Sequence, residues 1–261
     1  MAQISTYRSI WLSDVHLGTR ACRADFLLDF LRGTRCDVLY LLGDIIDLQR
    51  LRRSFYWPKS HTQVLRLVLA KQQQGTRVIY IPGNHDHDLR AFAGHTLAGI
   101  EIQRRAVHTT RSGKRLLMLH GDEFDQVIKY NALESLIGAF AYGSLLSANQ
   151  IVHRINALLG RPYWSLAQHV KTRLGKAVRY VENFRDACLN AARENGLDGV
   201  VCGHIHKAHL AEHEGLLYCN DGDWVESCTA LVEDRLGRLS LLSWPDSASC
   251  GEAMLSVKDA A

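Results

Sequence analysis

The sequence predicts an α/β protein, because short buried strands and helices alternate along the chain. Apolar runs that end abruptly in glycine or a polar residue indicate buried strands. Five such runs span residues 9–12, 37–42, 78–81, 116–119 and 199–202. Residues 24–31 and 63–74 instead carry apolar side chains at the three- and four-residue spacing of a helix. Gly33 and Gly75 follow these segments and are expected to cap the two helices.

Two pairs of apolar runs predict β-hairpins, so antiparallel strands are expected as well. The first turn contains Ser112-Gly113 and the second contains Gly237. Glycine suits such turns because it adopts a positive φ without a steric penalty. The flanking runs are residues 108–111 with 114–119, and residues 229–232 with 238–242.

Residues 123–190 interrupt this alternation with a long stretch of helical pattern and little strand signal, broken at Gly160-Arg161-Pro162. We expect a single domain over residues 1–261 that carries a helical insertion, or lid, at about 124–187. Residues 129–185 have a net charge of +6, which leaves the rest of the chain at −2. An apolar run over residues 133–146 accompanies this charge. The pairing suits an anionic amphiphile or a membrane surface, whereas the alternative is a packed helical cap with solvated basic residues.

The composition limits the class of protein. With 261 residues, 47% of them hydrophobic, the chain can bury a large core. It has no apolar run of the roughly 18 residues that a membrane span needs, and its start lacks the features of a secretory signal. We therefore expect a cytoplasmic protein. Seven scattered cysteines without a C-x-x-C pair argue against a disulfide framework or a zinc ribbon. A net charge of +4 is too low to indicate a nucleic-acid partner.

Side chains with oxygen or nitrogen donors follow all five predicted strands. Ligands gather at the carboxyl ends of strands in open α/β sheets, so these side chains are expected to converge. Imidazole and carboxylate donors without thiolate suit Mn, Fe, Zn, Co or Ni better than Mg or Ca. Seven donors are too many for one metal and fit two divalent ions if one carboxylate bridges them. They are Asp14, His16, Asp44, Asn84, His120, His204 and His206.

The order D-x-H, G-D-x-x-D, G-N-H-D, an isolated His and G-H-x-H resembles the signature of calcineurin-like metallophosphoesterases. Taken alone, each motif is more often structural. The resemblance implies two packed mixed sheets flanked by helices, and hydrolysis by a metal-bridging hydroxide. It also implies that Asp44 bridges both metals, for which manganese is the expected ion. The first metal would be held by Asp14, His16 and His206, and the second by Asn84, His120 and His204.

Residues next to these ligands have other expected roles. His85 is expected to protonate the leaving oxygen or to stabilise charge, with Asp86 fixing its tautomer. Asp47 either orients a ligand histidine or caps a helix, and Asp122 is similar. Trp224 and Glu226 either line the cleft or belong to a strand-end turn.

Within that family, the insertion and the segment 220–227 resemble bacterial UDP-2,3-diacylglucosamine diphosphatases of lipid A synthesis. Those enzymes cleave the pyrophosphate of a nucleotide sugar that carries two acyl chains, with Mn and a helical lid. The resemblance implies a lipid-linked nucleotide substrate, UMP as product and peripheral contact with the inner face of the cytoplasmic membrane. The chain departs from that group in two places. It has His85 where those enzymes have Arg, and its residues 123–126 differ from theirs. A soluble nucleotide or other phosphoester remains an alternative substrate, and a metal-bearing binding module is the alternative outside enzymes.

Overall fold

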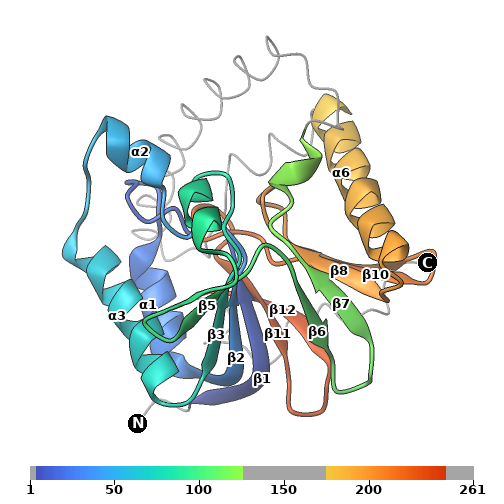
Figure 1. The fold of residues 1–261 in the computed structure, drawn as a ribbon, viewed down its shortest axis with the longest axis horizontal. Coiled ribbons are helices and arrows are strands. Elements are labelled where there is room, and N and C mark those ends of the chain that lie inside the picture. Colours follow the sequence, from blue (N-terminus) through green and yellow to red (C-terminus); the bar gives the residue numbers. More distant parts are fainter. Residues whose placement is uncertain (1–3, 126–174, 245–261) are drawn as a thin grey trace, which may run out of the picture.

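Two mixed β-sheets packed face to face form the centre of the protein (Figure 1). The computed structural model describes residues 4–125 and 175–244. The first sheet has seven strands in the order β12-β11-β1-β2-β3-β5-β4, and the second has five in the order β6-β7-β8-β10-β9. Strands β1, β2, β3 and β5 run parallel to one another, as do β7, β8 and β10, whereas the hairpins add antiparallel strands.

The strands of both sheets are short. Those of the first sheet are β1 (Ser5–Leu12), β2 (Thr34–Leu41), β3 (Arg77–Tyr80), β4 (Thr96–Leu97), β5 (Ile100–Ile102), β11 (Thr229–Glu233) and β12 (Leu239–Ser243). Those of the second sheet are β6 (Ala106–Thr109), β7 (Arg115–Met118), β8 (Gly199–Cys202), β9 (His209–His213) and β10 (Leu216–Asn220).

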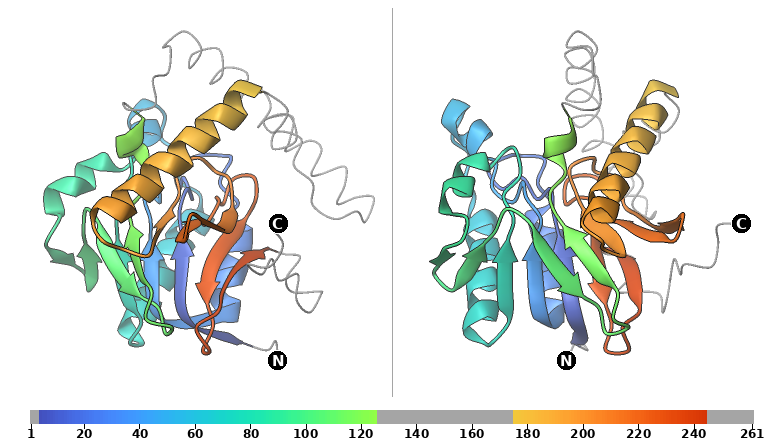
Figure 2. Two further views of the ribbon diagram at one scale, coloured as in Figure 1. Left: turned by 90° about the vertical axis from the view of Figure 1, so that its right-hand side faces the viewer. Right: turned by 45° about the vertical axis from the view of Figure 1, so that its right-hand side comes forward.

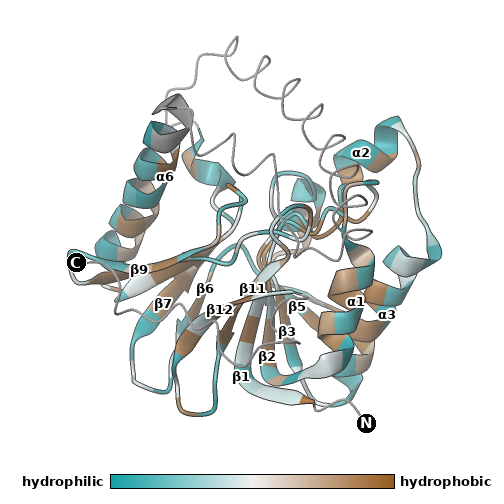
Figure 3. Ribbon diagram, turned by 180° about the vertical axis from the view of Figure 1, so that it is seen from behind, coloured by the Kyte–Doolittle hydropathy of each residue, from teal (hydrophilic) through white to brown (hydrophobic). Residues whose placement is uncertain are grey.

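Helices cover the outer faces of the two sheets. The first sheet is covered by α1 (Ala24–Gly33) and α3 (Lys59–Gln73), and the second by α6 (Gly175–Glu194), which crosses its outer face in Figure 2. The short α2 (Leu48–Arg53) buries none of its residues and is largely hydrophilic in Figure 3. Two 3-10 turns, η1 (His87–Phe92) and η2 (Asp122–Phe124), follow β3 and β7.

The central strands are apolar at successive positions because both of their faces are buried. Successive side chains of a strand point to opposite faces of the sheet. In β1, Ile10 and Leu12 pack beneath α1, whereas Trp11 enters the core between the two sheets. In β8, Val200 and Cys202 pack against α6, whereas Val201 faces the other sheet. A layered helix–sheet–sheet–helix structure follows from this alternation.

A buried polar chain joins the two sheets. His108 of β6 lies with Nε2 2.9 Å from the Glu233 carboxylate of β11 and Nδ1 3.0 Å from the Tyr40 hydroxyl of β2. A carboxylate only accepts, so Nε2 carries the hydrogen of this bond, and Nδ1 is the ring nitrogen that faces the Tyr40 hydroxyl. The Arg111 backbone N–H also donates to Glu233, at 2.7 Å. Trp11 stacks on Tyr40, with ring centroids 5.4 Å apart.

The predicted elements are largely confirmed. All five strands and both helices form near their predicted positions, and the two expected hairpins are β6–β7 and β11–β12. Gly75 adopts the positive φ expected after α3. The expectation for Gly33 is wrong, because this residue is the last of α1 and the chain enters β2 directly at Thr34.

Much of the predicted insertion lies outside the described residues, as do residues 133–146 and Gly160-Arg161-Pro162. Its last part is confirmed as helical by α6. The extent of the single domain, 1–261, stays a prediction. Within the part of the chain that the structure describes, no helix has the length and apolar character required to cross a membrane.

We expect Glu233→Ala to destabilise the protein by about 3–5 kcal/mol at pH 7, because removal of a buried charge leaves its hydrogen-bonding partners unmatched. Burial raises the pKa of Glu233, but hydrogen bonds from His108 and Arg111 outweigh it and hold the pKa below the ordinary 4.5. Its electrostatic contribution is therefore fully present above pH 4.5 and lost as the pH falls through the folded-state pKa.

Urea unfolding of wild type and variant at pH 7 and in acid measures this effect. The difference in unfolding free energy should shrink in acid. The control is Glu212→Ala, which breaks an exposed pair with Lys114 and should cost under about 1 kcal/mol. A Glu233 effect as small as the control would contradict a stabilising role for the buried chain.

Candidate metal centre

The predicted ligands meet where the carboxyl ends of the parallel strands of both sheets come together. Asp14 and His16 follow β1, Asp44 follows β2, and Asn84 follows β3. His120 follows β7, and His204 and His206 follow β8. Because the two sheets are packed against each other, strand ends from both contribute to one site (Figure 1).

Five of these residues adopt left-handed backbone conformations, with φ between 51° and 69°. A residue with a Cβ is rarely found there, since the conformation costs about 1–2 kcal/mol. Such strain concentrates at functional sites, where the surrounding structure enforces it. The backbone turns sharply at each strand end and directs the side chain inward. The five are Asp14, His16, Asp44, His204 and His206.

The glycines of two motifs are explained by the closeness of the ligands. A Cβ on Gly83 would lie 2.3 Å from Asp44 Oδ1 and 2.7 Å from His120 Nε2. A Cβ on Gly203 would lie 2.2 Å from Ser13 Oγ and 2.5 Å from Asp14 Oδ2. Only a residue without a side chain allows the strand ends to approach this closely.

The first group of donors surrounds Oδ1 of Asp14. The other oxygen of this carboxylate, Oδ2, accepts from Ser13 Oγ at 2.6 Å and from the His204 backbone N–H at 2.8 Å. Its Oδ1 is buried and lies 3.1 Å from His206 Nε2 and 3.9 Å from His16 Nε2. The two imidazole nitrogens are themselves 3.4 Å apart. These three atoms are arranged to share one cation.

Asp44 lies between this group and the second. Its Oδ1 accepts the His85 backbone N–H at 2.8 Å, which fixes the carboxylate. Its Oδ2 lies 3.8 Å from His16 Nε2 on one side and 3.5 Å from His120 Nε2 on the other. This oxygen therefore faces both groups, as a bridging carboxylate must.

The second group contains His120 and Asn84. His120 Nδ1 donates to the carbonyl oxygen of Leu42 at 2.7 Å, so that Nε2 is the ring nitrogen turned toward the centre. Nε2 lies 3.3 Å from Asn84 Oδ1. The ring of His204 is close, with its centroid 5.1 Å from that of His120. An oriented imidazole and an amide oxygen thus face the same space.

His204 has a partner that the sequence analysis missed. Both carboxylate oxygens of Asp125 lie 2.9 Å from His204 Nε2, and Asp125 also accepts from the Tyr180 hydroxyl of α6 at 2.8 Å. Asp125 follows the H-G-D motif by only three residues, but nothing in that spacing reveals its contact with a residue 79 positions away.

The electrostatics of the site fit a cation. Burial raises the pKa of Asp14 and of Asp44, but His206 and His120 respectively outweigh it, and both carboxyl groups have pKa values well below the ordinary range. Burial lowers the pKa of His16, but its hydrogen bond to Asp47 and the nearby carboxylates raise it to about 9. Asp44 likewise raises the pKa of His120 against the effect of burial. Ionised carboxylates here require positive charge, which protons or divalent metal can supply.

The expected pairing of His85 with Asp86 is wrong. His85 Nδ1 instead lies 3.0 Å from Asp47 Oδ1. The Asp86 carboxylate is fully buried and accepts from the Tyr80 hydroxyl and from the backbone N–H groups of Ile45 and Gly83. Because Asp86 bonds to the backbone of Ile45 and Gly83, it shapes the loops that carry the ligands. The His85 ring is paired with Asp47 instead.

Asp47 has both of the roles considered for it. It caps α2 by accepting the Arg50 backbone N–H at 2.7 Å. Its other oxygen lies 3.3 Å from His16 Nδ1, so it orients a predicted ligand as well as His85. Asp122 instead forms an ion pair with Arg90. Trp224 is fully buried and packs against Phe30, which supports the strand-end alternative over a place in the cleft.

Comparison with known proteins gives the family. The model of the calcineurin-like phosphoesterase family matches residues 7–208. The chain belongs to this family. The fold of two mixed sheets agrees with that membership, and the family and the His/Asp clusters together support a metal-dependent phosphoesterase that binds divalent metal.

Individual relatives are more distant. The UDP-2,3-diacylglucosamine hydrolase of Blochmanniella pennsylvanica is 29% identical over 116 residues, which are 43% of this chain and 46% of that protein. The match thus spans about half the length of this curated relative. A Vps29 single mutant from Entamoeba histolytica has a TM-score of 0.46 at 14% identity and covers 92% of this chain and 94% of its own. The phosphoesterase Yfce from E. coli has a TM-score of 0.46 at 13% identity, and the match covers 91% of this chain and 93% of that one. These structural similarities are too low to bear on activity.

We expect Asp44→Ala to lower hydrolysis of an aryl phosphodiester more than about 100-fold, because changes merely behind a metal ligand cost about 10–100-fold. Metal content measured on the purified variant should fall with the activity, since Asp44 faces both groups of donors. Asp37→Ala is the control, because Asp37 pairs with Arg235 at an exposed position. Full metal content in Asp44→Ala would show that this carboxylate does not bridge.

Proposed function

We propose that the protein is a dinuclear phosphoesterase in which Asp44 bridges two divalent metal ions. The observation that supports it most is the position of Asp44 Oδ2, 3.8 Å from His16 Nε2 and 3.5 Å from His120 Nε2. The first ion would be held by Asp14, His16 and His206, and the second by Asn84, His120 and His204.

The donor set favours manganese, with Fe, Zn, Co or Ni as alternatives, since it combines imidazole, carboxylate and amide without thiolate. When bound, such ions lower the pKa of water to yield a nucleophile near neutral pH and withdraw charge from the phosphoryl oxygens. The protein's part is to fix the donors. Ser13, Asp47 and the Leu42 carbonyl each hold one ligand in the orientation that it needs.

His85 is the residue placed to move a proton. Its Nε2 lies 4.0 Å from Asp44 Oδ2, and its side chain is 32% exposed, so it reaches the solvent side of the centre. Asp47 Oδ1 lies 3.0 Å from its Nδ1 and holds the orientation of the ring. We infer that His85 donates a proton to the departing oxygen as the phosphorus–oxygen bond breaks.

We propose UDP-2,3-diacylglucosamine, or a related lipid-linked nucleotide sugar, as the substrate and UMP as a product. The name of the Blochmanniella relative supports this choice, as do the sequence features of residues 220–227. It implies peripheral contact with the inner face of the cytoplasmic membrane and no nucleic-acid partner. A soluble nucleotide is the second candidate, favoured by His85 where the lipid A enzymes have Arg.

If His85 is the general acid, His85→Ala should lower kcat by roughly 10²–10³, the usual range for such a group. The loss should shrink for an aryl leaving group of low pKa, which departs without a proton. Metal content should stay at the wild-type value. Measuring kcat for a series of leaving groups tests this. An equal loss across the series would assign His85 to binding of the phosphoryl group.

The substrate is tested by incubating the full chain with UDP-2,3-diacylglucosamine in detergent micelles. With Mn present we expect release of UMP, and with chelator none, because the centre cannot then supply the nucleophile. Chromatography of the nucleotide products measures both. Efficient hydrolysis of soluble nucleotides without UMP from the lipid would favour the second candidate. Tight metal binding with no hydrolysis of any phosphoester would favour a binding module.

A further inference from the structure

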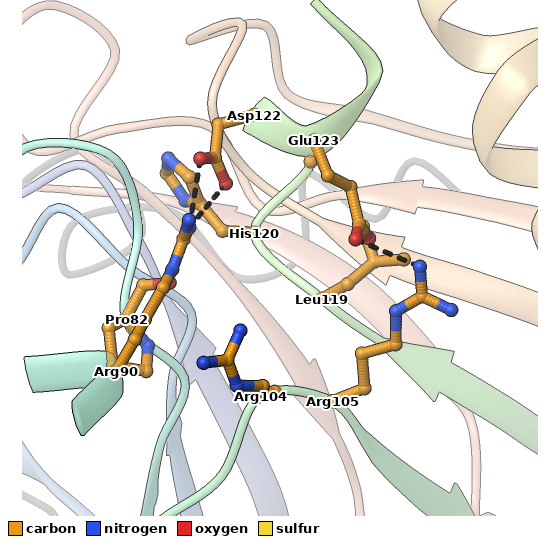
Figure 4. Close-up of a pocket in the computed structure, with 9 residues that line it drawn as sticks. Pro82, Arg90, Arg104, Arg105, Leu119, His120, Asp122 and Glu123 are labelled. Carbon is orange, nitrogen blue, oxygen red and sulfur yellow. Dashed lines mark hydrogen bonds and ion pairs between the residues drawn. The ribbon is translucent and has the colours of Figure 1, made fainter. Parts of the chain in front are cut away.

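A cavity of about 430 Å³ opens beside the candidate metal centre. Three arginines line it, and it shares His120 with the centre (Figure 4). Two acidic residues, Asp122 and Glu123, also line the cavity, across from Arg104 in Figure 4. The volume falls in the range of small-molecule sites, about 300–1,000 Å³.

The topology explains how the arginines come together. Arg104 and Arg105 lie in the short link between β5 of the first sheet and β6 of the second. The Gln103 N–H donates to the carbonyl oxygen of Tyr80 at 2.9 Å, which fixes this link at the carboxyl end of β3. Arg90 comes from η1, which follows the same strand. The arginines therefore lie at the edge where the ligands converge.

Two of the arginines are already paired with carboxylates. Arg90 Nη2 lies 2.7 and 2.8 Å from the two oxygens of Asp122, and it also donates to the carbonyl oxygen of Pro82. Arg105 Nη2 donates to Glu123 at 2.8 Å. These pairs hold the walls of the cavity in place, and among the described residues each leaves other N–H groups of its guanidinium without an acceptor.

Arg104 differs from its neighbours. It is exposed, and within residues 4–125 and 175–244 no acceptor is bonded to its guanidinium. In Figure 4 its side chain lies between those of Arg90 and Arg105. Because the other two charges are balanced by Asp122 and Glu123, Arg104 contributes the excess positive charge of the cavity.

We propose that Arg104, flanked by Arg90 and Arg105, binds the second phosphate of a diphosphate substrate whose first phosphate lies at the metal centre. The planar guanidinium fork matches phosphate oxygens and binds them in pairs. His120 lines the cavity and belongs to the candidate metal centre, so an anion bound in the cavity would lie on the His120 side of that centre. The inference rests on the proposed phosphoesterase function and adds to it the residue and the cavity that would select a diphosphate over an ester with one phosphate.

The first test is binding and needs no turnover. The full chain, treated with chelator, is titrated calorimetrically with methylenediphosphonate, which is not hydrolysed. Arg104→Ala should weaken binding about tenfold or more, since a hydrogen bond to a charged group contributes about 1.5–3 kcal/mol. Arg104→Lys should recover part of the loss. Arg66→Ala, an exposed arginine of α3 outside the cavity, is the matched control and should not change the affinity.

The second test is selectivity. For each variant, kcat/KM is measured on a nucleoside-diphosphate sugar and on an aryl phosphodiester. The ratio of the two values should fall about tenfold in Arg104→Ala and stay constant in Arg66→Ala. An unchanged ratio together with unchanged binding of methylenediphosphonate overturns the proposal. Equal weakening by Arg104→Ala and Arg66→Ala also overturns it, because the effect would then be one of general charge.

The two arms separate this inference from the proposed function. If the metal-loaded protein hydrolyses no phosphoester, the proposed function fails, while the loss of methylenediphosphonate binding in Arg104→Ala still supports the cavity as a diphosphate site. If hydrolysis occurs but Arg104→Ala changes neither the binding of methylenediphosphonate nor the ratio of the kcat/KM values, the function stands and the cavity does not bind the second phosphate.

Discussion

The left-handed turns at the strand ends are the constraint on which the site depends. Asp14, His16, Asp44, His204 and His206 all adopt a backbone conformation that a residue with a Cβ avoids. Each follows a strand that is buried on both faces, against the helices on one side and between the two sheets on the other. The apolar side chains of β1, β2 and β8 therefore do more than stabilise the fold, because they force the chain into the turns that bring the donors together.

A second layer of polar contacts decides which atom of each donor faces the centre. Ser13 occupies one oxygen of Asp14, the His85 N–H occupies one oxygen of Asp44, and the Leu42 carbonyl occupies Nδ1 of His120. In each case one donor atom is used behind the site and the other is left to face it. Such partners tune both orientation and basicity. Asp47 extends this layer to His85, so that ligand orientation and proton transfer share one carboxylate.

The sequence predicted the strands, the hairpins and the order of the donors, because buried strands and the motifs that follow them are local patterns. It could not assign strands to sheets, since β1 and β8 look alike as apolar runs but lie in different sheets. The predicted pairing of His85 with Asp86 was wrong because it relied on proximity in sequence. Asp86 is next to His85, but the turn after β3 sends their side chains to different partners, and Asp47, 38 positions earlier, takes the expected role. Contacts such as His108 with Glu233, 125 residues apart, leave no local signal.

The hydrogen bond between Asp125 and Tyr180 links the last residue described before the stretch 126–174 to α6, which follows that stretch. The described chain on either side of the stretch is therefore close together in space. None of the predicted ligands lies between these two residues in the sequence. Over evolution, one hydrolytic centre could thus be inherited unchanged while the segment that it carries diverges.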